Sequence, residues 1–233
     1  MFYCMLSPEY ETDRQEDRMN PLQEKHRVSM PGIRCEVCHT TWAGSRRLYL
    51  SNAEAARPLL KKVWALDAPL WHDLATSVKS KLGLPEAFLL KPGDTLSTPT
   101  YLLKGRPQPI MFPPLGAPLV EERVAQRLTE ANLTGLSLLP VSLVASGKGL
   151  LGEPPTAYFI LRVTANQKGT TEANKAVCDN CGYPGKSTSM PFPPELVAET
   201  DFFTLDENPY NIYVRQNVVD LFSLLELTNV RFL

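Results

Sequence analysis

Two short cysteine pairs constrain the fold of this chain more than any other feature. One pair lies at residues 35–38 (CEVC) and the other at residues 178–181 (CDNC) of a chain of 233 residues. The C-x-x-C spacing lets a tight turn direct two thiolates at one tetrahedral metal ion, and two such pairs supply the four ligands of a closed structural zinc site. The sequence therefore predicts one Zn²⁺ site formed by Cys35, Cys38, Cys178 and Cys181.

The residues that follow the two cysteine pairs differ. Gly182 follows the second pair, and a glycine lets the backbone turn back so that its N–H groups point at the sulfur atoms. His39 follows the first pair, where a glycine would be expected. The backbone geometry and the metal affinity of the first pair are therefore the weakest points of the zinc prediction.

Three other interpretations of the cysteine pairs stay open at the level of sequence. A C-x-x-C is also a thioredoxin-like redox motif, but that motif opens a helix after a strand in a βαβ unit, and neither pair has this setting. Residues 35–39 (CEVCH) match the haem attachment signature, which belongs to exported proteins. In the third interpretation, the four reduced cysteines lie close together without a metal ion.

The composition narrows the class of protein. Hydrophobic residues make up 43% of the chain, which is ample for a core, and the formal net charge is -1. Such a chain has no basic surplus that would bind a nucleic-acid backbone, so nucleic-acid binding is not expected. The low cysteine content suits a reducing compartment. Since no signal peptide or membrane-spanning run is recognisable, a cytoplasmic protein without a membrane association is expected.

The periodicity of the chain predicts an α+β fold with a mixed or antiparallel sheet and flanking helices, in a single domain over residues 1–233 that includes a zinc-ribbon-like pair of cysteine knuckles. Strands are expected at residues 2–6, 47–50, 136–144, 156–164, 200–204 and 211–214, and helices at 51–64 and 69–82. Residues 7–28 are expected to form a loop and residues 146–149 a hairpin turn. Asp67 is a candidate helix cap, and Trp64 and Trp71 are expected in the core rather than in a ligand pocket.

Two segments of the chain resemble each other without gaps. Residues 120–139 (VEERVAQRLTEANLTGLSLL) align on residues 214–233 (VRQNVVDLFSLLELTNVRFL). Each segment is typical of an amphipathic helix that ends at Leu-Thr and then Gly135 or Asn229, residue types that accept the left-handed helix cap, before an alternating strand. The alignment predicts two equivalent helix–strand elements of one sheet, although any helix, cap and strand in succession would share part of this pattern.

No catalytic motif is visible in the sequence. The three histidines, His26, His39 and His72, stand in no metalloprotease motif and in no recognisable nucleophile and base pattern. No acidic pair of the glycosidase kind and no dinucleotide fingerprint occurs either. The protein is therefore expected not to be an enzyme.

These features together resemble the double-CXXCG motif family, known chiefly from myxobacteria. The resemblance is carried by Cys35-x-x-Cys38 before Thr41-Trp42, by Cys178-x-x-Cys181-Gly182, by the wide separation of the two pairs, and by the terminal helix with its Leu-Thr-x-Val-x-Phe strand. It covers nearly the whole chain, and His39 departs from the glycine that is usual in the family. Members include immunity proteins of Sit-type contact-dependent toxins. The resemblance implies a non-catalytic protein that binds and neutralises one cognate bacterial toxin.

The sequence also suggests surfaces for two kinds of partner. If the toxin is a nuclease, acidic residues would imitate phosphate, and the acidic segments 9–17 and 199–207 are candidate contacts. The alternative function is a zinc-ribbon nucleic-acid-binding or transcription accessory protein, for which Arg46 and Arg47 near Trp42 are the one hint. An enzyme with a scattered site is a third class, which no motif supports.

Overall fold

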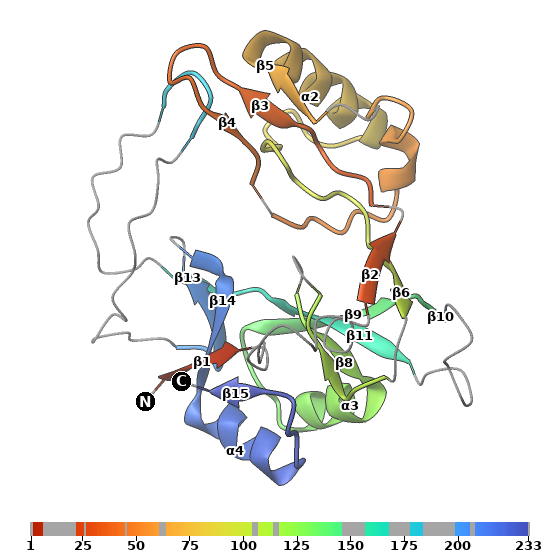
Figure 1. The fold of residues 1–233 in the computed structure, drawn as a ribbon, viewed down its shortest axis with the longest axis vertical. Coiled ribbons are helices and arrows are strands. Elements are labelled where there is room, and N and C mark those ends of the chain that lie inside the picture. The colour runs from red at the N-terminus through yellow and green to blue at the C-terminus, as the bar shows by residue number, and fades with distance from the viewer. Residues whose placement is uncertain are drawn as a thin grey trace, which may run out of the picture. The chain divides into compact units, whose positions relative to one another are not determined.

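The computed structural model describes residues 2–6, 22–25, 27–44, 46–60, 64–103, 107–113, 117–145, 157–167, 178–183, 199–205 and 208–232. The described residues form three α-helices and several sheets with antiparallel and mixed pairing, which confirms the predicted α+β class. Contacts within the chain gather in two compact units (Figure 1). We call them the sheet unit, which comprises residues 1–25, 100–172 and 189–233, and the cysteine unit, which comprises residues 26–99 and 173–188.

The sequence predicts one domain, whereas the structure has two units because an inserted segment brings a core of its own. In the sheet unit the helices are α3 (Glu122–Glu130) and α4 (Gln216–Leu224). Its strands are β1 (Phe2–Leu6), β2 (Leu22–Lys25), β6 (Thr100–Leu103), β7 (Ile110–Met111), β8 (Leu119–Glu121), β9 (Leu136–Val141), β10 (Leu143–Ala145), β11 (Tyr158–Val163), β12 (Asn166–Gln167), β13 (Phe202–Leu205), β14 (Asn208–Arg215) and β15 (Arg231–Phe232). The cysteine unit contains β3 (Gly32–Arg34), β4 (Thr41–Trp42), the 3₁₀ helix η1 (Ala53–Ala56), β5 (Ala65–Asp67) and α2 (Ala68–Leu82).

The sheet unit is built from two equivalent modules. Module A comprises β7, β8, α3 and β9, and β11 inserts between β8 and β9 to give the sheet order β7-β8-β11-β9. Module B comprises β13, β14, α4 and β15, and β1 inserts at the same place to give β13-β14-β1-β15, with β12 on the outer edge. Neighbouring strands within both four-strand sets are antiparallel. The predicted pair of helix–strand elements is confirmed as part of this larger repeat.

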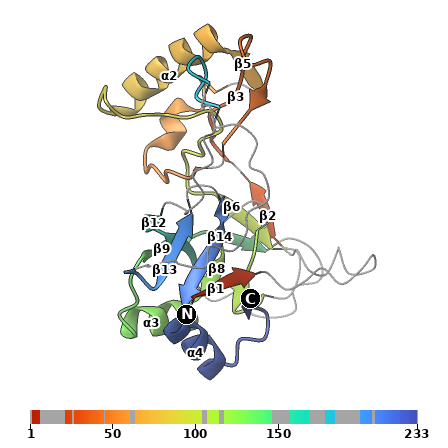
Figure 2. The same cartoon turned by 90° about the vertical axis from the view of Figure 1, so that its left-hand side faces the viewer.

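The two modules match in register and in burial. Glu121 at the end of β8 pairs with Tyr158 of β11, and the aligned Arg215 at the end of β14 pairs with Phe2 of β1. Three pairs of aligned apolar residues are at most 1% exposed: Val120 and Val214, Val124 and Val218, Leu128 and Phe222. They all belong to one hydrophobic core, which α3 and α4 cover side by side (Figure 2).

The two helices also end in the same way. Ala131 after α3 donates its N–H to the carbonyl of Arg127, and the aligned Leu225 after α4 donates to the carbonyl of Leu221. The next residues, Asn132 and Glu226, have φ values of 51° and 53°, so the left-handed caps lie three residues before the predicted positions Gly135 and Asn229. A left-handed conformation is uncommon for residues other than glycine, so its recurrence at aligned positions extends the repeat to the helix ends.

Each module places the fifth residue after its helix against the first strand of the other module. Gly135 has a φ of 82°, and a Cβ atom there would lie 2.0 Å from the carbonyl oxygen of Phe202 in β13. The aligned Asn229 donates its side-chain amide to the carbonyl of Ile110 in β7. Phe202 and Ile110 hold the same place in their modules, because they pair with aligned valines of β14 and β8. These reciprocal contacts have the pattern of a two-fold interface within one chain.

Helix α2 of the cysteine unit lies within one residue of the predicted helix 69–82 and ends at Gly83, which has a φ of 63°. Asp67 occupies the N-cap position, but its carboxylate pairs with Arg34 at 3.1 Å and makes no cap hydrogen bond. Trp71 is buried and donates Nε1 to the carbonyl oxygen of Pro31 at 2.9 Å, so its predicted place in the core is confirmed. The same prediction is wrong for Trp64, which precedes the helix and is 79% exposed.

Some predicted elements differ from the structure. Residues 47–50 form no strand, because Tyr49 adopts a φ of 53° and interrupts the extended backbone. The predicted helix 51–64 is reduced to η1 among its described residues, since Pro58 has no N–H group with which to continue a helix. The predicted loop 7–28 contains β2, whose pairing with β6 the local pattern did not indicate. The predicted turn at residues 146–149 lies outside the described residues.

Candidate metal centre

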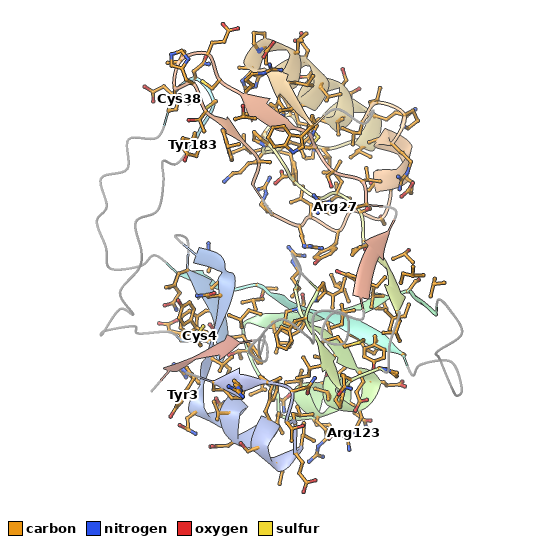
Figure 3. All side chains as sticks on the ribbon, viewed as in Figure 1. Tyr3, Cys4, Arg27, Cys38, Arg123 and Tyr183 are labelled. Atoms are coloured by element: carbon orange, nitrogen blue, oxygen red, sulfur yellow. The ribbon has the colours of Figure 1, made fainter. Side chains whose placement is uncertain are left out.

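The four cysteines of the two pairs come together in the cysteine unit. Their Sγ atoms all lie within 4.8 Å of one another. Across the two pairs, the Sγ atoms of Cys35 and Cys178 are 3.8 Å apart and those of Cys38 and Cys181 are 3.7 Å apart. The partners are 143 positions apart in the chain, and Figure 3 shows Cys38 and Tyr183 at the tips of the two loops that meet. The predicted grouping of these four residues is therefore confirmed.

The two cysteine pairs form knuckles with the same backbone geometry. In the first knuckle the N–H of Cys35 donates to the carbonyl of Thr40 at 3.0 Å, and in the second the N–H of Cys178 donates to the carbonyl of Tyr183 at 3.0 Å. The residue after each pair adopts the left-handed conformation, with φ of 53° at His39 and 71° at Gly182. His39 thus takes the conformation for which a glycine is the usual residue. The departure at this position leaves the turn of the first knuckle intact.

The cysteine cluster is continuous with the core of its unit. Cys35 is 1% exposed and Cys181 is 7% exposed, whereas Cys38 and Cys178 are partly exposed. The buried residues around them include Ile33 and Trp71, and Trp42 packs against the same core. A metal ion in this cluster would be shielded from water on the side of Cys35 and Cys181 and would lie near the surface on the side of Cys38 and Cys178.

The distances between sulfur atoms fit a tetrahedral metal ion. With metal–sulfur bonds of about 2.3 Å, a tetrahedron has edges of about 3.8 Å, close to the 3.7 Å and 3.8 Å found across the knuckles. All four cysteines of the cluster are free, and no disulfide joins them in this structure. Four sulfur donors in this arrangement match the ligand set of structural zinc sites and of iron–sulfur sites. The cluster can therefore hold one metal ion.

Two further side chains contact the sulfur atoms. Asn180 donates Nδ2 to Sγ of Cys35 at 3.3 Å, and this bond together with the backbone amide of Cys38 lowers the pKa of Cys35 to about 6. Burial raises the pKa of Cys181 to about 12, and the backbone amide of Tyr183 and the indole of Trp42 oppose that effect. The indole Nε1 is buried and completes no hydrogen bond within the described part of the chain. Sequence reasoning missed Asn180 and Trp42, although both stand within or close to the knuckles.

The setting of the knuckles bears on the other interpretations of the cysteine pairs. Neither pair opens an α-helix, since each lies in a turn of three residues, which disfavours a thioredoxin-like redox site. Both sulfur atoms of residues 35–38 face the second pair, an arrangement that haem attachment does not require.

Neither a scan against models of protein families nor a search of curated proteins finds a match to this chain. The interpretation of the site therefore rests on its geometry.

Other residues singled out in the sequence have structural surroundings or lie outside the described residues. Arg46 donates Nε to Oδ1 of Asp94 at 2.9 Å and a terminal nitrogen to the other oxygen at 2.5 Å, and Asp94 is fully buried. His39 and His72 are exposed, and the ring of His72 contacts the edge of Trp71. His26, the acidic segment 9–17 and residues 206–207 of the second acidic segment are not among the described residues.

No described α-helix combines the length and the apolar character needed to cross a membrane.

Proposed function

We propose that this protein is a non-catalytic immunity protein that binds and neutralises one cognate bacterial toxin in the cytoplasm, and that its cysteine cluster holds one structural Zn²⁺. The single observation that carries the proposal is the closed set of four thiols from two distant segments. Catalytic zinc sites keep one position open for water or substrate, whereas structural sites use four protein ligands. A structural site of this kind fits a protein that acts by binding a partner with its surface.

The likeness to the double-CXXCG family supports the immunity role. Both knuckles of that pattern share one backbone geometry in this chain, including the position where His39 replaces glycine. The terminal Leu-Thr-x-Val-x-Phe segment follows α4 and contributes Leu227, Val230 and Phe232 to the core of the sheet unit or its edge. The residues that carry the resemblance thus lie in the knuckles and the core. Family members could share this fold while their surface residues, and so their toxin partners, differ.

Exposed apolar side chains supply candidate anchors for the toxin. Trp64 is 79% exposed and lines a hollow of about 390 Å³ in the cysteine unit, together with Arg27, Arg57 and Leu60. Tryptophan and arginine are the residue types that contribute most to protein–protein binding energies. This surface is the candidate for the centre of the interface.

The structure weakens part of the hint for the alternative function, nucleic-acid binding. Of the two arginines near Trp42, Arg46 has a guanidinium that is paired with buried Asp94 and with the carbonyl of Leu89. An arginine that satisfies a buried carboxylate is needed for folding and is poorly available for a phosphate. The formal net charge of -1 points in the same direction.

The proposal is tested by expressing the protein together with the product of the gene beside its own. We expect a stoichiometric complex on co-purification, rescue of growth from the toxicity of that product, and one equivalent of zinc in the purified protein. Trp64→Ala should weaken the complex at least tenfold and leave the zinc content unchanged. The matched control is Leu70→Ala, which changes another exposed apolar side chain of the same unit at 57% exposure.

Each part of the proposal has its own contrary outcome. A neighbouring product that is harmless, or that does not bind, would remove the immunity role and leave the zinc site standing. If the protein contains no zinc after purification under reducing conditions, the proposed metal site is contradicted, and the immunity role can still be tested by binding.

A further inference from the structure

Two side chains approach the cysteine cluster, one from each of the two segments that form it. Asn180 belongs to the second knuckle and donates to Cys35 of the first knuckle at 3.3 Å. Trp42, in β4 after the first knuckle, lies beside Cys181 of the second knuckle. Its ring also contacts that of Tyr183, with ring centroids 6.0 Å apart. Each segment therefore places one N–H donor near a sulfur atom of the other.

The two sulfur atoms approached in this way are those of the buried cysteines. Cys35 and Cys181 are 1% and 7% exposed, while Cys38 and Cys178 are partly open to water. Four thiolates carry more negative charge than one Zn²⁺ neutralises, and the excess must be stabilised by hydrogen-bond donors or by solvent. Water can supply donors to the partly exposed sulfur atoms. For the buried pair, the protein has to supply them.

The unpaired indole of Trp42 supports the same conclusion. Its Nε1 is buried and has no hydrogen-bond partner among the residues that the structure describes. A buried donor without a partner is costly, and native proteins rarely leave one. A metal-bound thiolate at Cys181 is an acceptor of higher charge than a neutral thiol. A small shift of the indole toward that sulfur would satisfy both groups.

We propose that Asn180 and Trp42 are positioning residues of the metal centre, each donating a hydrogen bond to the buried thiolate of the opposite knuckle and so slowing the loss of the bound metal ion. The proposal rests on the zinc site proposed above and is independent of the toxin. Because the two donors cross between the segments 27–44 and 178–183, they also strengthen the link that the metal ion makes.

The test measures metal release in the full-length protein loaded with Zn²⁺. Transfer of zinc to a chromogenic chelator gives the rate of release and, by competition, the affinity. We expect Asn180→Ala and Trp42→Phe each to lower the affinity about tenfold, the usual scale for loss of a residue that supports a metal ligand. Asn180→Asp keeps the shape and puts a negative charge beside Sγ of Cys35, so it should release zinc faster than Asn180→Ala.

Two matched variants separate this role from general stability. Asp179→Asn changes the neighbouring exposed side chain of the same knuckle and should not accelerate release. Trp71→Phe removes an indole N–H that bonds to the carbonyl of Pro31 in the same core, so it should lower the melting temperature without changing release. Co²⁺ in place of Zn²⁺ should give the spectrum of four sulfur ligands in every variant, which shows that the four cysteines still bind.

The outcomes are distinguishable. Release from Asn180→Asp and Trp42→Phe within twofold of wild type would overturn the positioning role and leave the zinc site intact. Acceleration in Trp71→Phe equal to that in Trp42→Phe would also overturn it, because the effect would then follow core stability. Wild-type protein that binds no zinc would overturn both this inference and the proposed metal, whatever the result for the toxin.

Discussion

The two units of this chain reach stability in different ways. The core of the sheet unit includes the large side chains of Phe202 and Phe222, both at most 1% exposed, and it is shared by two equivalent modules. In the cysteine unit, four of the buried core positions are alanines: Ala53, Ala56, Ala68 and Ala75. Alanines bury little apolar area, so they contribute less free energy of folding than leucine or phenylalanine. Two further core members of this unit are the metal-ligand candidates Cys35 and Cys181.

A bound metal ion would compensate for the smaller side chains in the core of the cysteine unit. Small units with a modest core often gain stability from a further constraint, such as a disulfide or a metal ion. With a metal ion bound, the cluster would supply this constraint by joining residues 178–183 to the segment that contains β3 and β4. The sheet unit joins even more distant parts of the chain, β1 and β14, by strand pairing and by packing of their side chains.

The largest expected effect separates the two units. Cys178→Ser removes one of the four proposed metal ligands, and since structural zinc sites contribute about 10–16 kcal/mol of apparent binding energy in small domains, the cysteine unit should unfold. The sheet unit should stay folded because its core contains none of the four ligands. Hydrogen exchange should show lost protection in α2 and retained protection in β11 and β14.

The control for this experiment is Cys4→Ser. Cys4 is the one cysteine outside the two pairs, and it is buried in the sheet unit at 4% exposure. This variant should keep its zinc and its protected α2. Unchanged protection of α2 in metal-free Cys178→Ser would mean that the alanine-rich core suffices by itself.

The next effect is confined to the sheet unit. Phe222→Ala should destabilise it by about 4 kcal/mol, and Leu128→Ala, at the aligned position of module A, by about 3 kcal/mol. The three tryptophans of the chain all lie in the cysteine unit, at positions 42, 64 and 71. Tryptophan fluorescence during denaturation therefore follows the cysteine unit, and the exchange of β14 amides follows the sheet unit. Equal losses in both signals would show that the units unfold together.

A smaller effect tests the contact between the modules. The carboxylate of Asp201 accepts hydrogen bonds from the backbone and hydroxyl of Thr134 at 2.7 and 2.8 Å and from Asn217 at 2.8 Å. Burial acts to raise the pKa of Asp201, but these bonds outweigh it and the pKa is lowered. Asp201→Asn should therefore cost about 1 kcal/mol of unfolding free energy at neutral pH.

The pH dependence of this variant has a defined sign. A carboxyl group with a depressed pKa in the folded protein contributes stability above its unfolded pKa of about 4 and loses it as the pH falls further. The difference between wild type and Asp201→Asn should thus shrink in acid, as measured by urea denaturation at a series of pH values. A difference that stays constant down to the lowest pH would assign the effect to packing.

The smallest effect compares the two knuckles. His39 and Gly182 share a left-handed backbone, which costs a residue with a Cβ atom about 1 kcal/mol. His39→Gly should raise the melting temperature of the zinc-loaded cysteine unit, whereas Gly182→Ala should lower it. If His39→Gly were destabilising, the exposed imidazole would have a stabilising contact of its own.

Much of this fold could be predicted from local patterns. The spacing of the cysteines predicted the cluster, because C-x-x-C turns and four-sulfur chemistry leave few other arrangements. Apolar periodicity predicted α2, and the aligned segments predicted the paired α3 and α4. The alignment omitted the strands β11 and β1, which complete the two modules, because their order in the chain differs.

The failures have a common physical origin. Residues 47–50 have the composition of a strand, and the N–H groups of Leu48 and Leu50 donate to the carbonyls of Thr95 and Leu96. The left-handed conformation of Tyr49 nevertheless interrupts the extended backbone between them. Strand β2 has a polar sequence and forms because β6 offers a partner edge. In the metal centre, the asparagine and the tryptophan were visible in the sequence, but the sulfur atom that each faces depends on how two remote turns meet.

Local patterns in the sequence were enough to predict the knuckle turns, the amphipathic helices and the repeat of helix and strand, but not the left-handed residues at Asn132 and Glu226. Tertiary packing specifies which strands complete each module, the division of the chain into two units, and the approach of Asn180 and Trp42 to the opposite knuckle. Local patterns act through backbone conformation and the burial of nearby side chains, which a short window of residues specifies. The contact of Asn180 with Cys35, across 145 positions, depends on the packing of everything between them, and no short window contains that information.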